Sequence, residues 1–134
     1  MSADRPSISV INDNPEFLEL MRDILDEDAG YAVTTFHDGE TSVDQLAASN
    51  PDLIIVDLLL GGSSGWEIVA LARADERLKE VPVIVCSADV AALRERAGDF
   101  ERIGRIHVLA KPFGIEELTG LVEKLVGRAA PESV

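Results

Sequence analysis

The chain has 134 residues, of which 46% are hydrophobic, and its 12 lysines and arginines stand against 25 aspartates and glutamates. This length suffices for one domain that buries a core without disulfides or a structural metal. The net charge of −13 disfavours direct contact with nucleic acid or an anionic membrane, and it suits a cation and protein partners. No stretch approaches the roughly 18 consecutive apolar residues of a membrane span, and no secretory signal is visible, so we expect a cytoplasmic protein.

Strand-like segments alternate with helix-like segments five times along the chain, which is typical of a parallel sheet wrapped by helices. We expect a single α/β domain over residues 1–127, with 128–134 as a flexible C-terminal tail. Its fold should be a doubly wound, flavodoxin-like (βα)5 sheet of five parallel strands in the order 2-1-3-4-5. The expected strands are residues 7–11, 31–36, 53–57, 83–86 and 106–109.

Apolar residues at helical spacing predict the helices between these strands. The first runs from Asn14-Pro15 to Gly30, the third from Trp66 toward Leu78, and the fourth from about Val90 to Phe100, while 61–65 form a flexible loop. The expected buried stripes are Phe17, Leu20, Met21, Ile24 and Leu25 in the first helix, Val43, Leu46 and Ala47 in the second, and Ile115, Leu118, Leu121, Val122 and Leu125 in the last.

Four of the predicted strands end in side chains that can carry chemistry. Asp57 ends the apolar run 53–56, where an ionised carboxylate costs free energy and therefore indicates a functional role. The other three strands are followed by Asn12-Asp13, by Ser87 and by Lys111. Ligands of parallel sheets gather at the carboxyl ends of the strands. These side chains therefore form the candidate site.

The order 2-1-3 places Asp13 and Asp57 side by side at the point where the strand order reverses. Two carboxylates in one cleft share a proton or bind a cation, and Mg²⁺ prefers carboxylate, water and phosphate oxygens. Lys111 would add a positive charge and Ser87 a hydroxyl. A nucleophile, a metal, a cation and an oriented donor are the components of phosphoryl transfer.

With these residues the chain resembles the receiver domain of two-component response regulators over nearly its whole length. The resemblance rests on residues 10–15 (VINDNP), on Asp57 with Gly65 eight residues later, on Ser87-Ala88 and on 111–113 (KPF). It implies a phosphorelay signalling domain that switches protein contacts and that catalyses only its own phosphotransfer and dephosphorylation.

The resemblance also implies a role for each site residue. Asp57 would accept a phosphoryl group from a sensor histidine kinase or a phosphotransfer protein. Mg²⁺ would be bound by Asp13, by Asp57, by the backbone carbonyl of Leu59 and, through a water, by Asn12. Ser87 would swing toward the phosphoryl group and Lys111 would pair with it. A downstream protein target or output domain, and a possible homodimer, would read the change.

Three positions depart from the commonest pattern of this family. Asn12 stands where an acid is more usual, so we expect one fewer charge and a lower metal affinity. Gly61 replaces a frequent proline, which predicts a looser loop beside the site. Val108 replaces an aromatic residue that rotates on activation in many receivers, so that form of the switch cannot operate here.

Other interpretations remain open at this point. Asp13 could cap a helix, Ser87 could do the same, and Lys111 could be solvated. A receiver-like adaptor that binds partners without phosphorylation is one alternative function. A Mg²⁺-dependent phosphohydrolase with an aspartate nucleophile is the other, although such enzymes need a second acid where this chain has Leu59.

Overall fold

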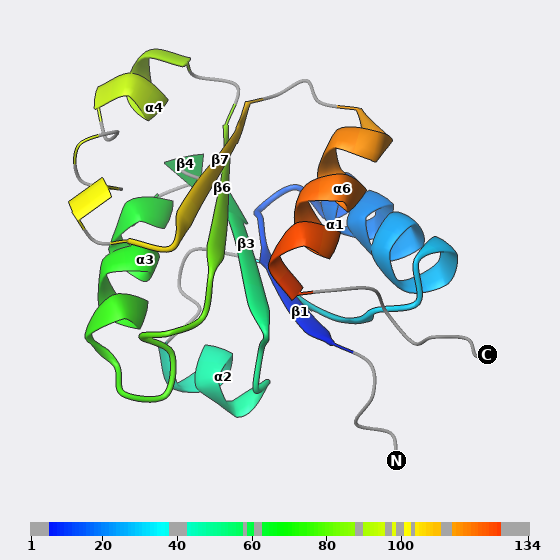
Figure 1. Cartoon of the computed structure of the whole chain (residues 1–134), viewed down its shortest axis with the longest axis horizontal. Helices are drawn as coiled ribbons and strands as arrows, with labels where there is room; N and C mark the ends of the chain where they lie inside the picture. Colours follow the sequence, from blue (N-terminus) through cyan, green and yellow to red (C-terminus); the bar gives the residue numbers. More distant parts are fainter. Residues whose placement is uncertain are drawn as a thin grey trace.

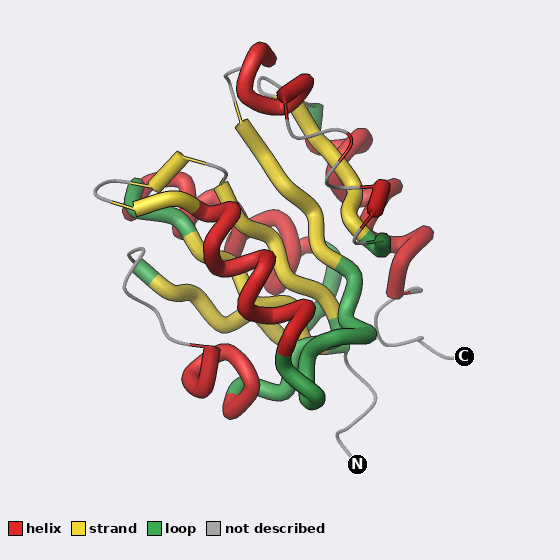
Figure 2. Tube along the Cα trace, turned by 90° about the vertical axis from the view of Figure 1, so that its left-hand side faces the viewer, coloured by secondary structure: helices red, strands yellow, loops and turns green. Residues whose placement is uncertain are grey.

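The computed structural model describes residues 6–37, 43–57, 59–60, 63–87, 90–95, 98, 101–102, 104–110 and 114–126. Its main sheet is parallel and has the order β2-β1-β3-β6-β7, formed by β1 (Ser7–Ile11), β2 (Ala32–Phe36), β3 (Leu53–Asp57), β6 (Val83–Ser87) and β7 (Ile106–Ala110). Counted along the chain, this is the predicted order 2-1-3-4-5. The strands lie side by side in a twisted sheet (Figure 2).

Helices cover both faces of this sheet (Figure 1). One face carries α1 (Pro15–Arg22), the π-helix η2 (Asp23–Asp28) and α6 (Ile115–Val126), while the other carries α2 (Val43–Ala48) and α3 (Gly65–Ala74). The short helix α4 (Val90–Glu95) follows β6. This is the doubly wound architecture that the sequence predicts.

Two apolar clusters form the core, one on each face of the sheet. Strand β3 contributes to both, because successive side chains of a strand point to opposite faces. Leu53 and Ile55 join the cluster under α1 and α6, while Ile54 and Val56 join the cluster under α2 and α3, and all four are buried. The continuous apolar run before Asp57 is thus explained by burial on both sides.

The first helix begins as predicted but continues differently. The Asn14 side chain accepts hydrogen bonds from the backbone N–H groups of Glu16 and Phe17, at 2.9 and 3.4 Å, and thereby caps α1. The chain changes to a π-helix at Asp23 and stops before Gly30, which has a φ of 84°. The predicted start at Asn14-Pro15 and stop at Gly30 are therefore confirmed, but the second part of the helix is a π-helix, which was not predicted.

Two leucines also correct the predicted stripe of this helix. Leu18 is buried, whereas Leu20 is 49% exposed. The buried positions Leu18, Met21 and Leu25 follow one another at spacings of three and four residues. Leu20 lies on the flank of that face, since each residue turns the helix by about 100°. In α6, Leu118 and Val122 are buried as predicted, but Ile115 in the first turn is 59% exposed.

The segment after β3 is more ordered in structure than the predicted loop. Strands β4 (Leu59–Leu60) and β5 (Ser63–Ser64) pair antiparallel, and α3 begins directly at Gly65. Helix α3 then ends at Ala74 and not near Leu78. The carboxylate of Asp75 accepts the backbone N–H of Arg77 at 2.8 Å, and this local bond competes with helical hydrogen bonding.

Some predictions lie outside the described residues. These are the segment 111–113, Gly61, the tail 128–134 and part of the expected helix between Val90 and Phe100. Within the ranges that the structure describes, no helix has the length and apolar character to cross a membrane.

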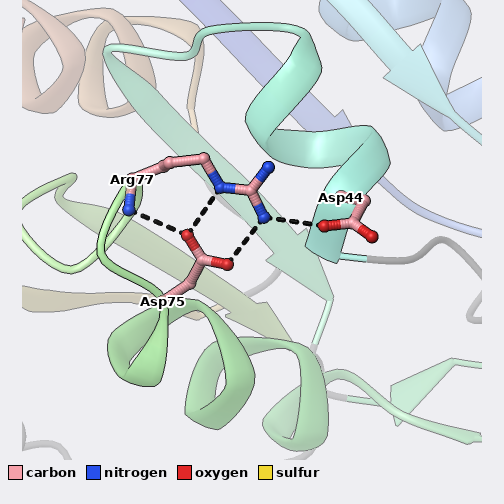
Figure 3. A network of polar contacts seen from close by, with 3 residues as sticks. All are labelled: Asp44, Asp75 and Arg77. Atoms are coloured by element: carbon pink, nitrogen blue, oxygen red, sulfur yellow. Dashed lines mark hydrogen bonds and ion pairs between the residues drawn. The ribbon is translucent and has the colours of Figure 1, made fainter.

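An ion-pair network on the surface ties α2 to the turn after α3 (Figure 3). The Arg77 guanidinium donates from Nη2 to Oδ1 of Asp44 at 2.7 Å and to Oδ2 of Asp75 at 2.8 Å, and from Nε to Oδ1 of Asp75 at 3.0 Å. The side-chain and backbone hydrogen bonds from Arg77 lower the pKa of Asp75 to about 2. The network holds the turn that leads into β6.

Leu46 and Leu71 provide a matched test of this packing. Leu46 in α2 is fully buried, whereas Leu71 in α3 is 57% exposed. We expect Leu46→Ala to lower the free energy of unfolding by about 2–5 kcal/mol, because it leaves a cavity. Leu71→Ala should change it by less than about 0.5 kcal/mol. Urea unfolding measures both, and similar losses would contradict the assigned packing of α2.

The Asp75 pKa predicts an acid-sensitive part of the stability. A carboxyl whose pKa falls on folding stabilises the protein above its unfolded pKa, and this contribution is lost as the pH falls through the folded pKa. The window therefore runs from near 3.8 down to about 2. We expect Asp75→Asn to flatten the pH dependence of stability there. Glu76→Gln, which removes the neighbouring carboxylate, is the control, and an unchanged profile for Asp75→Asn would contradict the network.

Candidate functional site

The parallel register brings the carboxyl ends of four strands to one edge of the sheet. Ile11 in β1 is level with Val56 in β3, and Asp57 is level with Cys86 in β6. Ser87, the last residue of β6, is level with Ala110 at the end of β7. The predicted gathering of the ends of β1, β3, β6 and β7 is thus present in the structure.

Buried polar side chains concentrate at this edge. Among the described residues, those classed as buried and polar are Ser9, Asn12 and Ser87. Asn12 is 2% exposed and Ser87 is 1% exposed, and both lie at the carboxyl edge. Burying a polar group is unfavourable unless it is hydrogen-bonded. Two buried polar side chains at the edge that carries Asp57 therefore indicate a candidate binding or reaction site there.

Asn12 and Asp57 are in direct contact. The side-chain Nδ2 of Asn12 donates to Oδ2 of Asp57 at 3.3 Å, and its Oδ1 accepts the backbone N–H of Asn14 at 2.8 Å. Alternation explains the contact: Val10 and Ile55 belong to the same apolar cluster, and the residues two positions on, Asn12 and Asp57, continue that face. The backbone N–H of Asn12 donates to the carbonyl oxygen of Phe36 at 3.1 Å and so extends the hydrogen bonding between β1 and β2 by one residue.

Asp57 is half-buried, and Asp13 is exposed beside Asn12. Asn14, and not Asp13, supplies the side-chain cap of α1. The interpretation of Asp13 as the cap of this helix is therefore wrong.

Ser87 lies next to the site but on the other side of the sheet. Along β6, Val83 and Val85 face the cluster under α3, and alternation places Ser87 with them. Ser87 thus continues the face of β6 under α3, whereas Asp57 continues the face of β3 under α1 and α6.

The remaining predicted site residues are Leu59 and Lys111. Leu59 lies in β4, two residues beyond Asp57, where it pairs with Ser64. Lys111 follows Ala110 at the end of β7 in sequence and lies outside the described residues.

Oxygen donors dominate this edge, which suits a hard cation. Asp13 and Asp57 each carry a carboxylate, while the amide of Asn12 is bonded to Asp57 and to the backbone N–H of Asn14. In the part of the chain that the structure describes, no group of three or more histidines, cysteines, aspartates or glutamates could hold a metal ion. A metal here would thus depend on two carboxylates together with backbone and water oxygens, as Mg²⁺ tolerates.

The sequence did not predict the direct bond between Asn12 and Asp57. The resemblance to receiver domains implies that Asn12 holds a metal-bound water, and the register between β1 and β3 was not predicted to one residue. The signal that could have shown the contact is the pair of apolar runs that end in Asn12 and Asp57, because equal phase on adjacent strands puts both side chains on one face.

The doubly wound sheet in this order defines a flavodoxin-like α/β domain. The family model described as response regulator receiver domain matches residues 8–123, and the chain belongs to this family. It is accordingly a phosphorelay signalling domain.

Individual relatives agree with this membership. The polar-differentiation response regulator DivK of Brucella ovis is 30% identical over 126 residues, with 92% of this chain and 98% of DivK covered. The receiver domain of the sensor histidine kinase PA1611 from Pseudomonas aeruginosa PAO1, with a magnesium ion in its active site cleft, is 28% identical with a TM-score of 0.77, covering 92% of this chain and 98% of that one. The response regulator TrrA from Thermotoga maritima, in complex with Mg²⁺-BeF, is 28% identical with a TM-score of 0.75, covering 90% and 98%.

Other curated relatives are much longer than this chain. The chain spans 8% and 12% of two histidine kinases and 50% of each of two transcriptional regulators. Receiver domains therefore occur both as nearly whole proteins, as in DivK, and as parts of larger ones.

Proposed function

We propose that this domain accepts a phosphoryl group on Asp57 in a Mg²⁺-dependent reaction and that the modification changes its contacts with other proteins. The observation that carries the proposal is the position of Asp57 at the carboxyl end of a doubly buried strand, in contact with the buried Asn12. Asp57 is half-buried there, which suits reaction with a group presented at the edge of the sheet.

The donors at this edge fit Mg²⁺. The proposed ligands are Asp13, Asp57 and the backbone carbonyl of Leu59, with Asn12 acting through a water. Solved relatives with Mg²⁺ in the cleft or with Mg²⁺-BeF support this assignment. When bound, the ion would neutralise negative charge on the phosphoryl oxygens.

The chain's own residues would carry out the transfer. One carboxylate oxygen of Asp57 forms a bond to phosphorus while the bond to the donor's leaving group breaks. Lys111 would pair with the phosphoryl oxygens, and Ser87 would donate its hydroxyl to one of them. Since alternation places Ser87 on the far side of the sheet, that bond would pull on the start of α4.

The proposed donor is a sensor histidine kinase or a phosphotransfer protein, and the proposed reader is a downstream protein or an output domain. The acidic chain, with a net charge of −13, supports protein partners over nucleic acid. Homodimer formation belongs to the same proposal, as does the division into a domain over 1–127 and a tail. Catalysis is limited to the domain's own phosphotransfer and dephosphorylation.

Asp57 and Asp52 allow a matched test of the phosphoacceptor. They stand at opposite ends of β3, with Asp52 accepting the backbone N–H of Ser7 at 2.8 Å. After incubation with Mg²⁺ and a small acyl phosphate, intact-protein mass should show one added phosphoryl group in the wild type and in Asp52→Asn. Asp57→Asn, and wild type in EDTA, should show none. Uptake by Asp57→Asn would contradict the proposal.

Ser87 and Ser9 are matched buried serines in the same sheet, and Ser9 bonds to the Ser49 hydroxyl at 2.8 Å, away from the site. We expect Ser87→Ala to take up the phosphoryl group but to lose most of the amide chemical-shift change that phosphorylation produces in α4. Ser9→Ala should keep this response. A full α4 response in Ser87→Ala would show that the hydroxyl does not transmit the modification.

A further inference from the structure

Asn12 joins the end of β1 to the end of β3 through both ends of its amide. Its Oδ1 accepts the Asn14 N–H at 2.8 Å and its Nδ2 donates to Asp57 at 3.3 Å. A backbone N–H can only donate, so the first bond identifies the amide oxygen and leaves the NH₂ group facing Asp57. The side chain is 2% exposed, which restricts its movement. The amide therefore has one fixed orientation relative to the carboxylate.

An aspartate at position 12 could not make this pair of contacts. One of its oxygens could still accept from Asn14, but the other would lie against Oδ2 of Asp57, where the amide nitrogen is now at 3.3 Å. Two ionised carboxylates at that separation repel unless a proton or a cation lies between them. The asparagine replaces this repulsion with a charge-assisted hydrogen bond.

We propose that Asn12 is a positioning residue that holds the Asp57 carboxylate in place without a metal ion, and that this same bond makes the site bind Mg²⁺ more weakly than an acid at position 12 would. The inference rests on the proposed function, because it concerns the residue that we assign as phosphoacceptor. Its consequence is a resting site that is ordered without metal and that responds to Mg²⁺ only at higher concentration.

Magnesium affinity tests whether Asn12 makes the site bind Mg²⁺ more weakly than an acid would. In calorimetric titrations with MgCl₂ and no phosphoryl donor, Asn12→Asp should bind at least about tenfold more tightly than wild type, since attraction between adjacent opposite charges exceeds the about 1.4 kcal/mol that a factor of ten represents. Asn14→Asp is the matched control: it adds the same charge nearby and keeps a good capping residue. Its affinity should change by less than about threefold because exposed charges are screened.

A double-mutant cycle tests whether Asn12 holds the Asp57 carboxylate in place. Thermal unfolding in EDTA would compare wild type, Asn12→Ala, Asp57→Ala and the double variant. If Asn12 positions Asp57, Asn12→Ala should lower the Tm clearly in the wild-type background and by less than half as much in the Asp57→Ala background. Should Asn12→Ala not fold, Asn12→Ser, which shortens the side chain and keeps a polar group, takes its place in the cycle.

The results separate this inference from the proposed function. Equal Tm losses in the two backgrounds, or equal Mg²⁺ affinities for wild type and Asn12→Asp, would overturn the positioning role even if Asp57 is phosphorylated. Coupling in the cycle together with tighter Mg²⁺ binding by Asn12→Asp would establish it, including the case in which the wild type takes up no phosphoryl group and the proposed function fails.

Discussion

The parallel pairing of β1 with β3 is the constraint on which the rest of the structure depends. Ile8 to Ile11 run level with Leu53 to Val56, and both strands are buried on their two faces. Polar side chains are therefore placed at the strand ends or, like Ser9, are hydrogen-bonded by another hydroxyl. The common register makes the two strands end together. Asn12 and Asp57 meet for this reason, and the site is a consequence of how the sheet is packed.

The two faces of the sheet end in different polar residues at this edge. The face under α1 and α6 ends in Asn12 and Asp57, whereas the face under α3 ends in Ser87. The proposed modification on Asp57 would thus arise on one face, and Ser87, whose hydroxyl is proposed to sense it, continues the other. Because a packed sheet does not deform continuously, such a contact would shift the chain after β6 between discrete arrangements. This geometry makes α4 the proposed region of response.

Much of this could be predicted from the sequence, because apolar runs and their alternation depend on burial alone. The bounds of β3 and the polar residues at the strand ends follow from such runs. The strand order was predicted because 2-1-3-4-5 is the common order for five alternating strands and helices. Local hydrogen bonds that compete with helix formation were harder to predict. The Asp75 carboxylate ends α3 early by accepting the Arg77 N–H. The π-helix after Arg22 was also not predicted. The Asn12 contact was missed since it depends on register to one residue, which no single segment encodes.

The most direct test of the assigned phosphoacceptor is to locate the acyl phosphate in the chain. After reaction with Mg²⁺ and a small acyl phosphate, borohydride reduction converts a phosphorylated aspartate to homoserine, which peptide mass spectrometry can place by residue. We predict homoserine at position 57 and at no other aspartate. Homoserine at Asp13 or elsewhere, with Asp57 unmodified, would contradict the assignment of Asp57 as the residue around which this edge of the sheet is built.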